Sequence, residues 1–183
     1  NNSVLSLGAQ ISNIGAKISY TDNNNRDFLP TNLRVGGAYT LQLDPYNTLS
    51  FLLDFNKLLV PTVARDKSLL SGMFGSFSDA PGGGSEELKE VMTSAGVEYR
   101  YQDIFAARLG YFNEAREKGD RKYLTAGVGF QAGYFMPMLN NLVFDLAYIV
   151  PTNQREHPLA ETLRFSLVLQ LKEANYDQES VTD

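Results

Sequence analysis

Apolar and polar residues alternate along most of this chain, which is the pattern of β-strands whose two faces meet different surroundings. The clearest case is segment 33–43, where Arg34, Thr40 and Gln42 lie between apolar residues. Similar alternation recurs in segments 5–20, 49–55, 95–101, 105–111, 124–130, 142–148 and 163–171. In the first of these the alternation changes phase at Asn13, which predicts a β-bulge or bend. The pattern therefore predicts about eight strands.

The lengths of the strands and of their connections narrow the fold class. Several predicted strands span about 10–13 residues, whereas globular strands usually have about 5–6 and membrane strands about 9–11. Long connections at 21–30, 61–91 and 151–161 alternate with short ones at 44–47, 102–104 and 136–141, and an intermediate one lies at 115–120. Outer-membrane barrels have short periplasmic turns and longer extracellular loops. We predict an all-β, antiparallel transmembrane β-barrel of the cell outer membrane.

The two faces of the predicted strands differ in charge. One face carries Leu, Val, Phe and Ala together with tyrosines that suit an interfacial girdle: Tyr39, Tyr99, Tyr101, Tyr111 and Tyr148. The other face carries charges of both signs: Arg34, Asp54, Glu98, Arg100, Arg108, Glu114, Asp145 and Arg164. Because an Arg or Lys facing lipid at mid-depth costs about 2–4 kcal/mol, we expect these residues to form a paired network in the lumen.

Bulk composition does not by itself point to a membrane. The 183 residues carry a net charge of -5, 43% of them are hydrophobic, and the mean hydropathy is -0.23. No apolar run approaches the roughly 18–20 residues of a spanning helix. A soluble β-sandwich with one wet face per sheet is the alternative fold. The acidic balance argues against nucleic acid as a partner.

The acidic, aperiodic segment 173–183 is expected to be a disordered periplasmic tail, with residues 1–172 forming the barrel portion.

The connection 61–91 is too long for a simple link between strands. Its apolar residues at helical spacing are Leu69, Leu70, Met73, Phe74 and Phe77. A glycine-rich break follows at 79–84, and Ser85 is placed to cap a second short helix. The segment is either a folded surface loop or an extracellular element that contacts a partner or reaches over the lumen.

Candidate catalytic and ligand-binding residues are few. His157 lies in a predicted loop, and Glu98 and Glu114 are expected to pair with Arg100 and Arg108 rather than to act as paired carboxylates. Segment 82–84 lacks the Lys and Ser/Thr of a phosphate loop. We therefore expect no enzyme, cofactor or metal site. Gly127 and Gly129 allow either a tight barrel wall or close approach of a plug or ligand.

Several segments in order resemble one known family. They are SNIGAKISY at 12–20, FLPTNLRVG at 28–36, FSDAPGG at 77–83, EELKE at 86–90, GVEYRY at 96–101, RLGYFNE at 108–114 and TLRFSL at 162–167. Their combination resembles the PorV-type proteins of the type IX secretion system of Bacteroidetes. PorQ-type and fatty-acid-transporter-like (FadL-like) barrels share part of it.

The resemblance implies a FadL-like barrel of about 14 strands, of which this chain supplies about the last eight. The first residues then lie in the middle of a longer protein. It also implies a non-enzymatic component that docks with a large translocon barrel (SprA/Sov-like) and a PorU-like attachment component. Such a protein receives cargo with a C-terminal signal domain and sits among outer-membrane lipids. The alternatives are a FadL-like channel for hydrophobic small molecules and a structural eight-stranded barrel.

Overall fold

The computed structural model describes residues 2–15, 17–18, 27–61, 68–134, 138, 142–152 and 162–169. These residues form one eight-stranded antiparallel sheet in which strand order follows chain order. The strands are β1 (Ser3–Ser12), β2 (Asn32–Gln42), β3 (Asn47–Leu58), β4 (Val91–Tyr101), β5 (Phe105–Asn113), β6 (Lys122–Gln131), β7 (Leu142–Pro151) and β8 (Thr162–Leu169). The predicted all-β antiparallel class and the strand number are confirmed, and the single sheet replaces the sandwich alternative.

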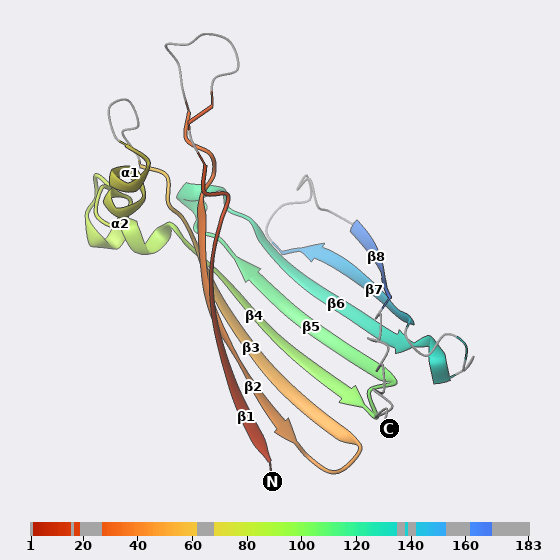
Figure 1. The fold of residues 1–183 in the computed structure, drawn as a ribbon. Helices are drawn as coiled ribbons and strands as arrows, with labels where there is room; N and C mark the ends of the chain where they lie inside the picture. Colours follow the sequence, from red (N-terminus) through yellow and green to blue (C-terminus); the bar gives the residue numbers. More distant parts are fainter. Residues whose placement is uncertain are drawn as a thin grey trace, which may run out of the picture.

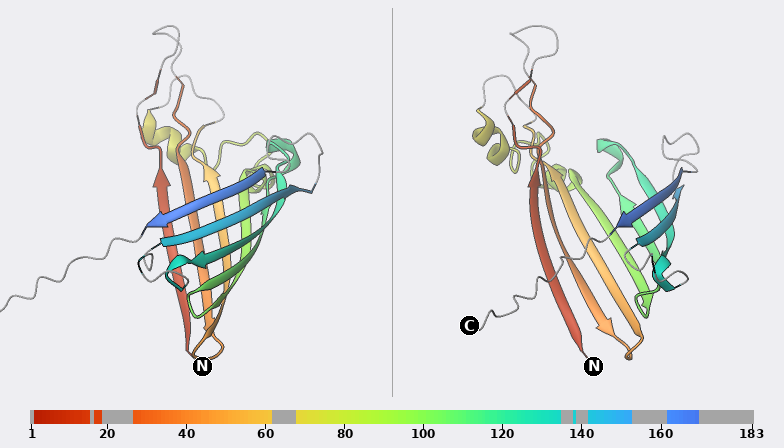
Figure 2. Two further views of the ribbon diagram at one scale, coloured as in Figure 1. Left: turned by 90° about the vertical axis from the view of Figure 1, so that its right-hand side faces the viewer. Right: turned by 45° about the vertical axis from the view of Figure 1, so that its right-hand side comes forward.

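The sheet is strongly curved, and β1 and β8 form its two edges (Figure 1). The right-hand view of Figure 2 shows how the sheet bends round, with β1–β3 on one side of its concave face and β6–β8 on the other. Every neighbouring pair is a hairpin with an unbroken register, such as Ser3 opposite Leu41 through Ser12 opposite Asn32. The described strands thus form a curved wall with two open edges.

Successive connections alternate between the two ends of this wall (Figure 1), but the predicted separation by length is not strict, because the β6–β7 connection (132–141) is longer than the β5–β6 connection (114–121) at the opposite end. At the turn end, the β2–β3 turn is held by Asp44, whose carboxylate accepts hydrogen bonds from the Tyr46 and Asn47 amides at 2.8 and 2.9 Å. In the β4–β5 turn, the Ile104 amide donates to the Tyr101 carbonyl at 2.9 Å, and Gln102 and Asp103 between them both have positive φ, as the central residues of a type I′ turn require. The opposite end, called here the loop end, carries the connections after β1, β3, β5 and β7.

The phase change at Asn13 coincides with the end of β1. Asn13 has a φ of 57°, a left-handed conformation that Asn tolerates better than most residues. Its side-chain amide donates to the Pro30 carbonyl at 3.2 Å, and the Thr31 hydroxyl donates to the Asn13 carbonyl at 3.0 Å. The hairpin therefore continues beyond the sheet, where Ile18 pairs with Asp27.

Two short helices occupy the β3–β4 connection: α1 (Leu69–Gly75) and α2 (Gly84–Lys89). Ser68 caps α1 by accepting from the Ser71 amide. The prediction that Ser85 caps the second helix is wrong. The helix α2 begins at Gly84, so Ser85 lies inside it, and its N-cap is Gly83, with a φ of 70°. We call residues 68–90 the cap.

The most buried residues lie at the loop end, under and beside the cap. Leu59, Met73 and Ser76 are almost fully buried there. The sheet itself buries little, since its outer side chains have no second layer to pack on within the described residues. None of the helices in the described part of the chain has the length and apolar character to cross a membrane. His157 and the tail 173–183 lie outside the described residues.

Candidate functional site

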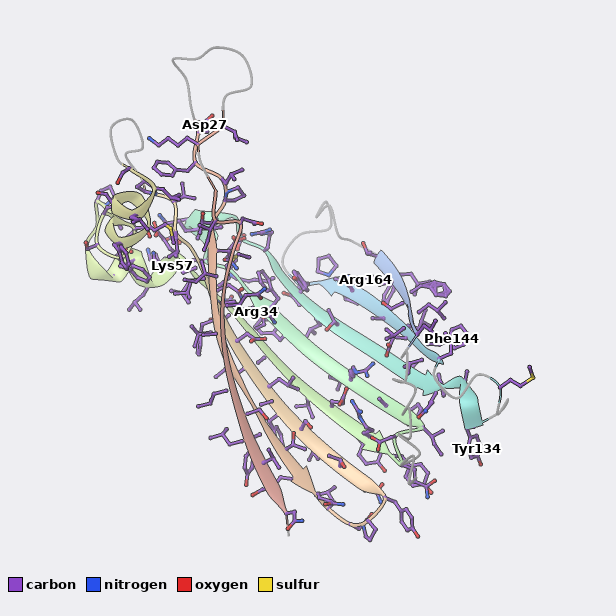
Figure 3. The ribbon with its side chains drawn as sticks, viewed as in Figure 1. Asp27, Arg34, Lys57, Tyr134, Phe144 and Arg164 are labelled. Carbon is purple, nitrogen blue, oxygen red and sulfur yellow. The ribbon has the colours of Figure 1, made fainter. Side chains whose placement is uncertain are left out.

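The register separates the strand residues into two faces. Arg34 and Asp54 lie on the same face as Glu98, which is directly opposite Arg108 in β5. Through β6 this face continues to Asp145 in β7 and Arg164 in β8. Figure 3 shows Arg34 and Arg164 on the hollow side of the sheet, called here the inner face, and Phe144 on the outer side.

The outer face is apolar along almost the whole length of the strands. Leu7, Phe51, Leu109 and Phe165 are among its exposed residues, and Phe165 is 73% exposed. The outward tyrosines are not confined to strand ends: Tyr101 ends β4, whereas Tyr39 and Tyr148 lie inside β2 and β7. The charged residues at outward strand positions are Lys57 and Lys122, both near the loop end. An apolar band thus covers the outside of the wall.

A chain of ion pairs crosses four strands on the inner face. Glu98 accepts from Arg100 at 2.8 Å and from Arg108 at 2.5 Å. Arg108 also donates to Asp145, two strands away from β5. Arg100 reaches Asp103 in the turn at 3.5 Å. Because each arginine lies between two carboxylates, the cluster largely neutralises its own charge without a ligand.

Glycines in the strands leave the space that these charged side chains occupy on the inner face. Gly129 sits in β6 between Arg108 and Asp145, and a Cβ built on it would stand 2.6 Å from Asp145 Oδ1 and 3.0 Å from Arg108 Nη1. A Cβ on Gly36 would collide with Asp54, the partner of Arg34 at 2.7 Å. Gly129 therefore makes room for the ion pair between Arg108 and Asp145.

Four of the eight predicted network residues lie apart from this chain, and two of them, Arg34 and Asp54, pair with each other. Arg164 is on the inner face of β8 opposite Ala147, and it joins none of the ion pairs found in the described residues. Glu114 follows the end of β5 and is 5% exposed. It accepts two hydrogen bonds from Arg121, at 2.6 and 2.7 Å. The hydrogen bonds from Arg121 outweigh partial burial and lower the pKa of Glu114. Glu114 thus fastens the β5–β6 connection instead of pairing with Arg108.

The five predicted partner-contact residues do not share one surface. Met73 is buried against the body of the protein, and Leu69 is half-buried. Leu70 and Phe74, one helical turn apart on α1, are 64% and 73% exposed. Phe77 is also exposed. The helical periodicity located the helix but could not tell which of its two apolar edges packs inward.

Ion pairs that sequence reasoning missed fix α2 to the wall. Lys57 in β3 donates to Glu87 at 2.9 Å and to Glu90 at 2.7 Å. Lys118 in η1 (Arg116–Lys118) donates to Glu86 at 3.0 Å and to Glu90 at 2.9 Å. Lys57 is only 7% exposed although it points to the outer side, because α2 covers it. The sequence signal for these ion pairs was Lys57 itself, a lysine on the outward face of a strand that is otherwise apolar.

The same contacts lower the pKa values of the carboxyl groups in α2 and at its C-cap. The hydrogen bond from Lys57 is the main reason that the pKa of Glu87 lies below its ordinary value. Partial burial would raise the pKa of Glu90, but hydrogen bonds from Lys57 and Lys118 outweigh it and lower the pKa. Both glutamates are therefore ionised in this arrangement at neutral pH.

An antiparallel wall of long strands, apolar outside and charged inside, has the architecture of part of a β-barrel. Residues 2–65 match the model of a family described as type IX secretion system protein PorV. The resemblance to PorV-type proteins is thereby confirmed over residues 2–65, about a third of the chain. No curated protein matches the chain.

Proposed function

We propose that this protein is a non-enzymatic outer-membrane component of a type IX secretion system that docks partner proteins through its loop end. The family match supports the role in type IX secretion. The proposed location in the membrane rests on the contrast between the two faces of the wall. Charges facing hydrocarbon would each cost about 2–4 kcal/mol, and the inner-face ion pairs avoid that cost only if the apolar face meets the lipid.

The open edges of the wall support completion of a larger barrel. Among the described strands, β1 and β8 each pair on one side only. Unpaired backbone groups in hydrocarbon cost several kcal/mol each, so membrane strands occur in closed barrels. We propose that further strands pair with β1 and β8 to close a barrel of about 14 strands, within a longer protein.

Partner docking is proposed for the exposed edge of α1. Leu70 and Phe74 present adjacent apolar side chains on a cap that ion pairs hold to the wall. Large apolar side chains on a rigid, exposed element have the properties of interface anchors. The partners we propose are the large translocon barrel, a PorU-like attachment component and cargo with a C-terminal signal domain. The alternative of a FadL-like channel gains no support, since the inner positions of this wall carry paired charges.

The docking proposal is tested by affinity capture of tagged full-length protein from detergent-solubilised outer membranes. Phe74→Asp should lower recovery of the translocon barrel about tenfold or more, as expected for loss of an interface anchor. Ser71→Asp is the matched control, because it adds the same charge to an exposed position of α1. Equal recovery with both variants, or no translocon barrel with the unaltered protein, contradicts the docking proposal.

A further inference from the structure

An apolar groove runs between the cap and the outer side of the wall at the loop end. Leu33 and Val35 of β2 and Phe55 of β3 form its floor, and Phe77 and Leu88 of the cap form its other wall. Its volume is about 290 Å³, several times the roughly 30 Å³ that one water occupies in the liquid. We propose that this groove binds an acyl chain of an outer-membrane lipid, an inference that rests on the proposed membrane placement.

The chemistry of the lining favours a hydrocarbon chain over a polar ligand. The groove is lined mainly by apolar side chains, and its charged neighbours are Lys57 and Glu87. These two already bind each other at 2.9 Å, and Glu90 gives Lys57 a second carboxylate at 2.7 Å. A polar ligand would therefore find few partners here, whereas an acyl chain needs only apolar contact.

The position of the groove favours a membrane lipid as the source of that chain. Val35 and Phe55 face one another across β2 and β3 at outward positions, and Phe51 and Leu53 continue along β3 towards the turn end. The next outward pair is Gly37 opposite Leu53, and Tyr39 opposite Phe51 follows it. The floor of the groove is thus continuous with the apolar band, so an acyl chain enters it without crossing water.

The groove does not depend on the ligand for its shape. Ion pairs from Lys57 and Lys118 hold α2 in place, and Lys89 adds a bond to Glu117 at 2.8 Å. A preformed site loses less conformational entropy on binding than a flexible one. We therefore expect lipid at this position to be retained through purification.

The test uses full-length protein in vesicles of phosphatidylethanolamine that contain a phospholipid with a diazirine near the end of one acyl chain. After irradiation, peptide mass spectrometry locates the adducts. The expected result is that peptides containing Leu33 or Leu88 carry at least five times the label of the outward position Leu109. Equal labelling at Leu109 and at the groove overturns the inference.

Leu88→Glu should abolish the excess labelling by placing a charge in the groove. The matched control is Leu70→Glu, which changes another largely exposed leucine of the same cap outside the groove. Heat-modifiable gel migration checks that both variants fold. Loss of the excess in both variants, or in neither, overturns the inference. Absence of label at every outward position overturns the membrane placement as well, whereas uniform label leaves that placement standing.

Discussion

Arg108 in β5 reaches across Gly129 of the intervening strand β6 to bind Asp145 in β7, while its other side binds Glu98 in β4. A pair that skips a strand is possible because the wall curves and Gly129 has no side chain to obstruct it. One guanidinium therefore links β4 and β7 to its own strand on the inner face and passes over β6. This cross-link opposes flattening of the wall more directly than a pair between neighbouring strands does.

Gly129→Ala should weaken this cross-link. The added Cβ would stand 2.6 Å from Asp145 Oδ1, so the pair must separate or shift. We expect a loss of about 1–2 kcal/mol in unfolding free energy, comparable to loss of charge-assisted hydrogen bonds. The measurement is urea unfolding of the refolded barrel, followed by tyrosine fluorescence because the chain has no Trp.

Gly8→Ala is the matched control for that experiment. Gly8 also points to the inner face, but a Cβ there meets nothing within 4 Å. Its stability should be unchanged or slightly raised, since Ala has less backbone freedom to lose. Equal destabilisation by both substitutions would show that glycine content, rather than the Arg108–Asp145 pair, determines stability.

Arg108→Met should destabilise the wall more than Arg34→Met. Removing Arg108 leaves Asp145 without the cation that binds it and Glu98 with Arg100 alone, at an expected cost of about 1–3 kcal/mol. Arg34 is 51% exposed in its side chain, and its one ion pair within the described ranges is with Asp54, so its removal should cost less than about 1 kcal/mol. The same unfolding measurement compares them, and a larger loss for Arg34→Met contradicts the proposed importance of the cross-strand chain.

Much of the wall follows from alternation alone. The side chains of a strand alternate strictly between two faces, so the charge of each face could be assigned before the register was known. Which charged residues pair with one another could not be assigned in this way, because the pairing depends on the curvature of the sheet. Arg108 binds a residue two strands away, and Glu114, which continues the same alternation, leaves the sheet to bind Arg121.

The cap was less predictable than the wall. A helical pattern identified α1, but Leu69 and Met73 lie on one side of it and Leu70 and Phe74 on another, and all four are apolar. Only tertiary packing decides which side is buried. The N-cap of the second helix is Gly83, a glycine with positive φ, rather than the serine that side-chain capping favours. Its attachment by Lys57 joins residues 30 and 33 positions apart, beyond the range of local patterns.

Lys57→Met should loosen the cap while leaving the strands intact. The substitution keeps an unbranched apolar stem and removes the terminal ammonium group, so it leaves Glu87 and Glu90 without a cation that binds both. We expect amide hydrogen exchange in 84–90 to accelerate about tenfold or more, corresponding to about 1.4 kcal/mol of lost local stability. Lys89→Met is the control, because its pair with Glu117 is largely exposed. Equal acceleration in both variants argues against Lys57 as the anchor.

Acidification should release the cap before it unfolds the wall. The pKa of Glu86 is lowered mainly by its hydrogen bond from Lys118, and that of Glu87 mainly by its bond from Lys57. Carboxylates with lowered folded-state pKa values stabilise the folded state above their ordinary value of about 4.3, and this contribution disappears as the pH falls through the folded values. Protection of 84–90 should therefore be constant from about pH 7 to 5 and fall below about pH 4.

Limited proteolysis by pepsin over the acidic range, with mass spectrometry of the fragments, measures this release. The double variant Glu87→Gln, Glu90→Gln removes both carboxylates that bind Lys57, so its cap should be cleaved faster and with a weaker pH dependence. The strands serve as the internal reference, because backbone pairing does not titrate. A cap whose cleavage follows the same pH dependence in the variant and the unaltered protein would show that these glutamates do not hold it.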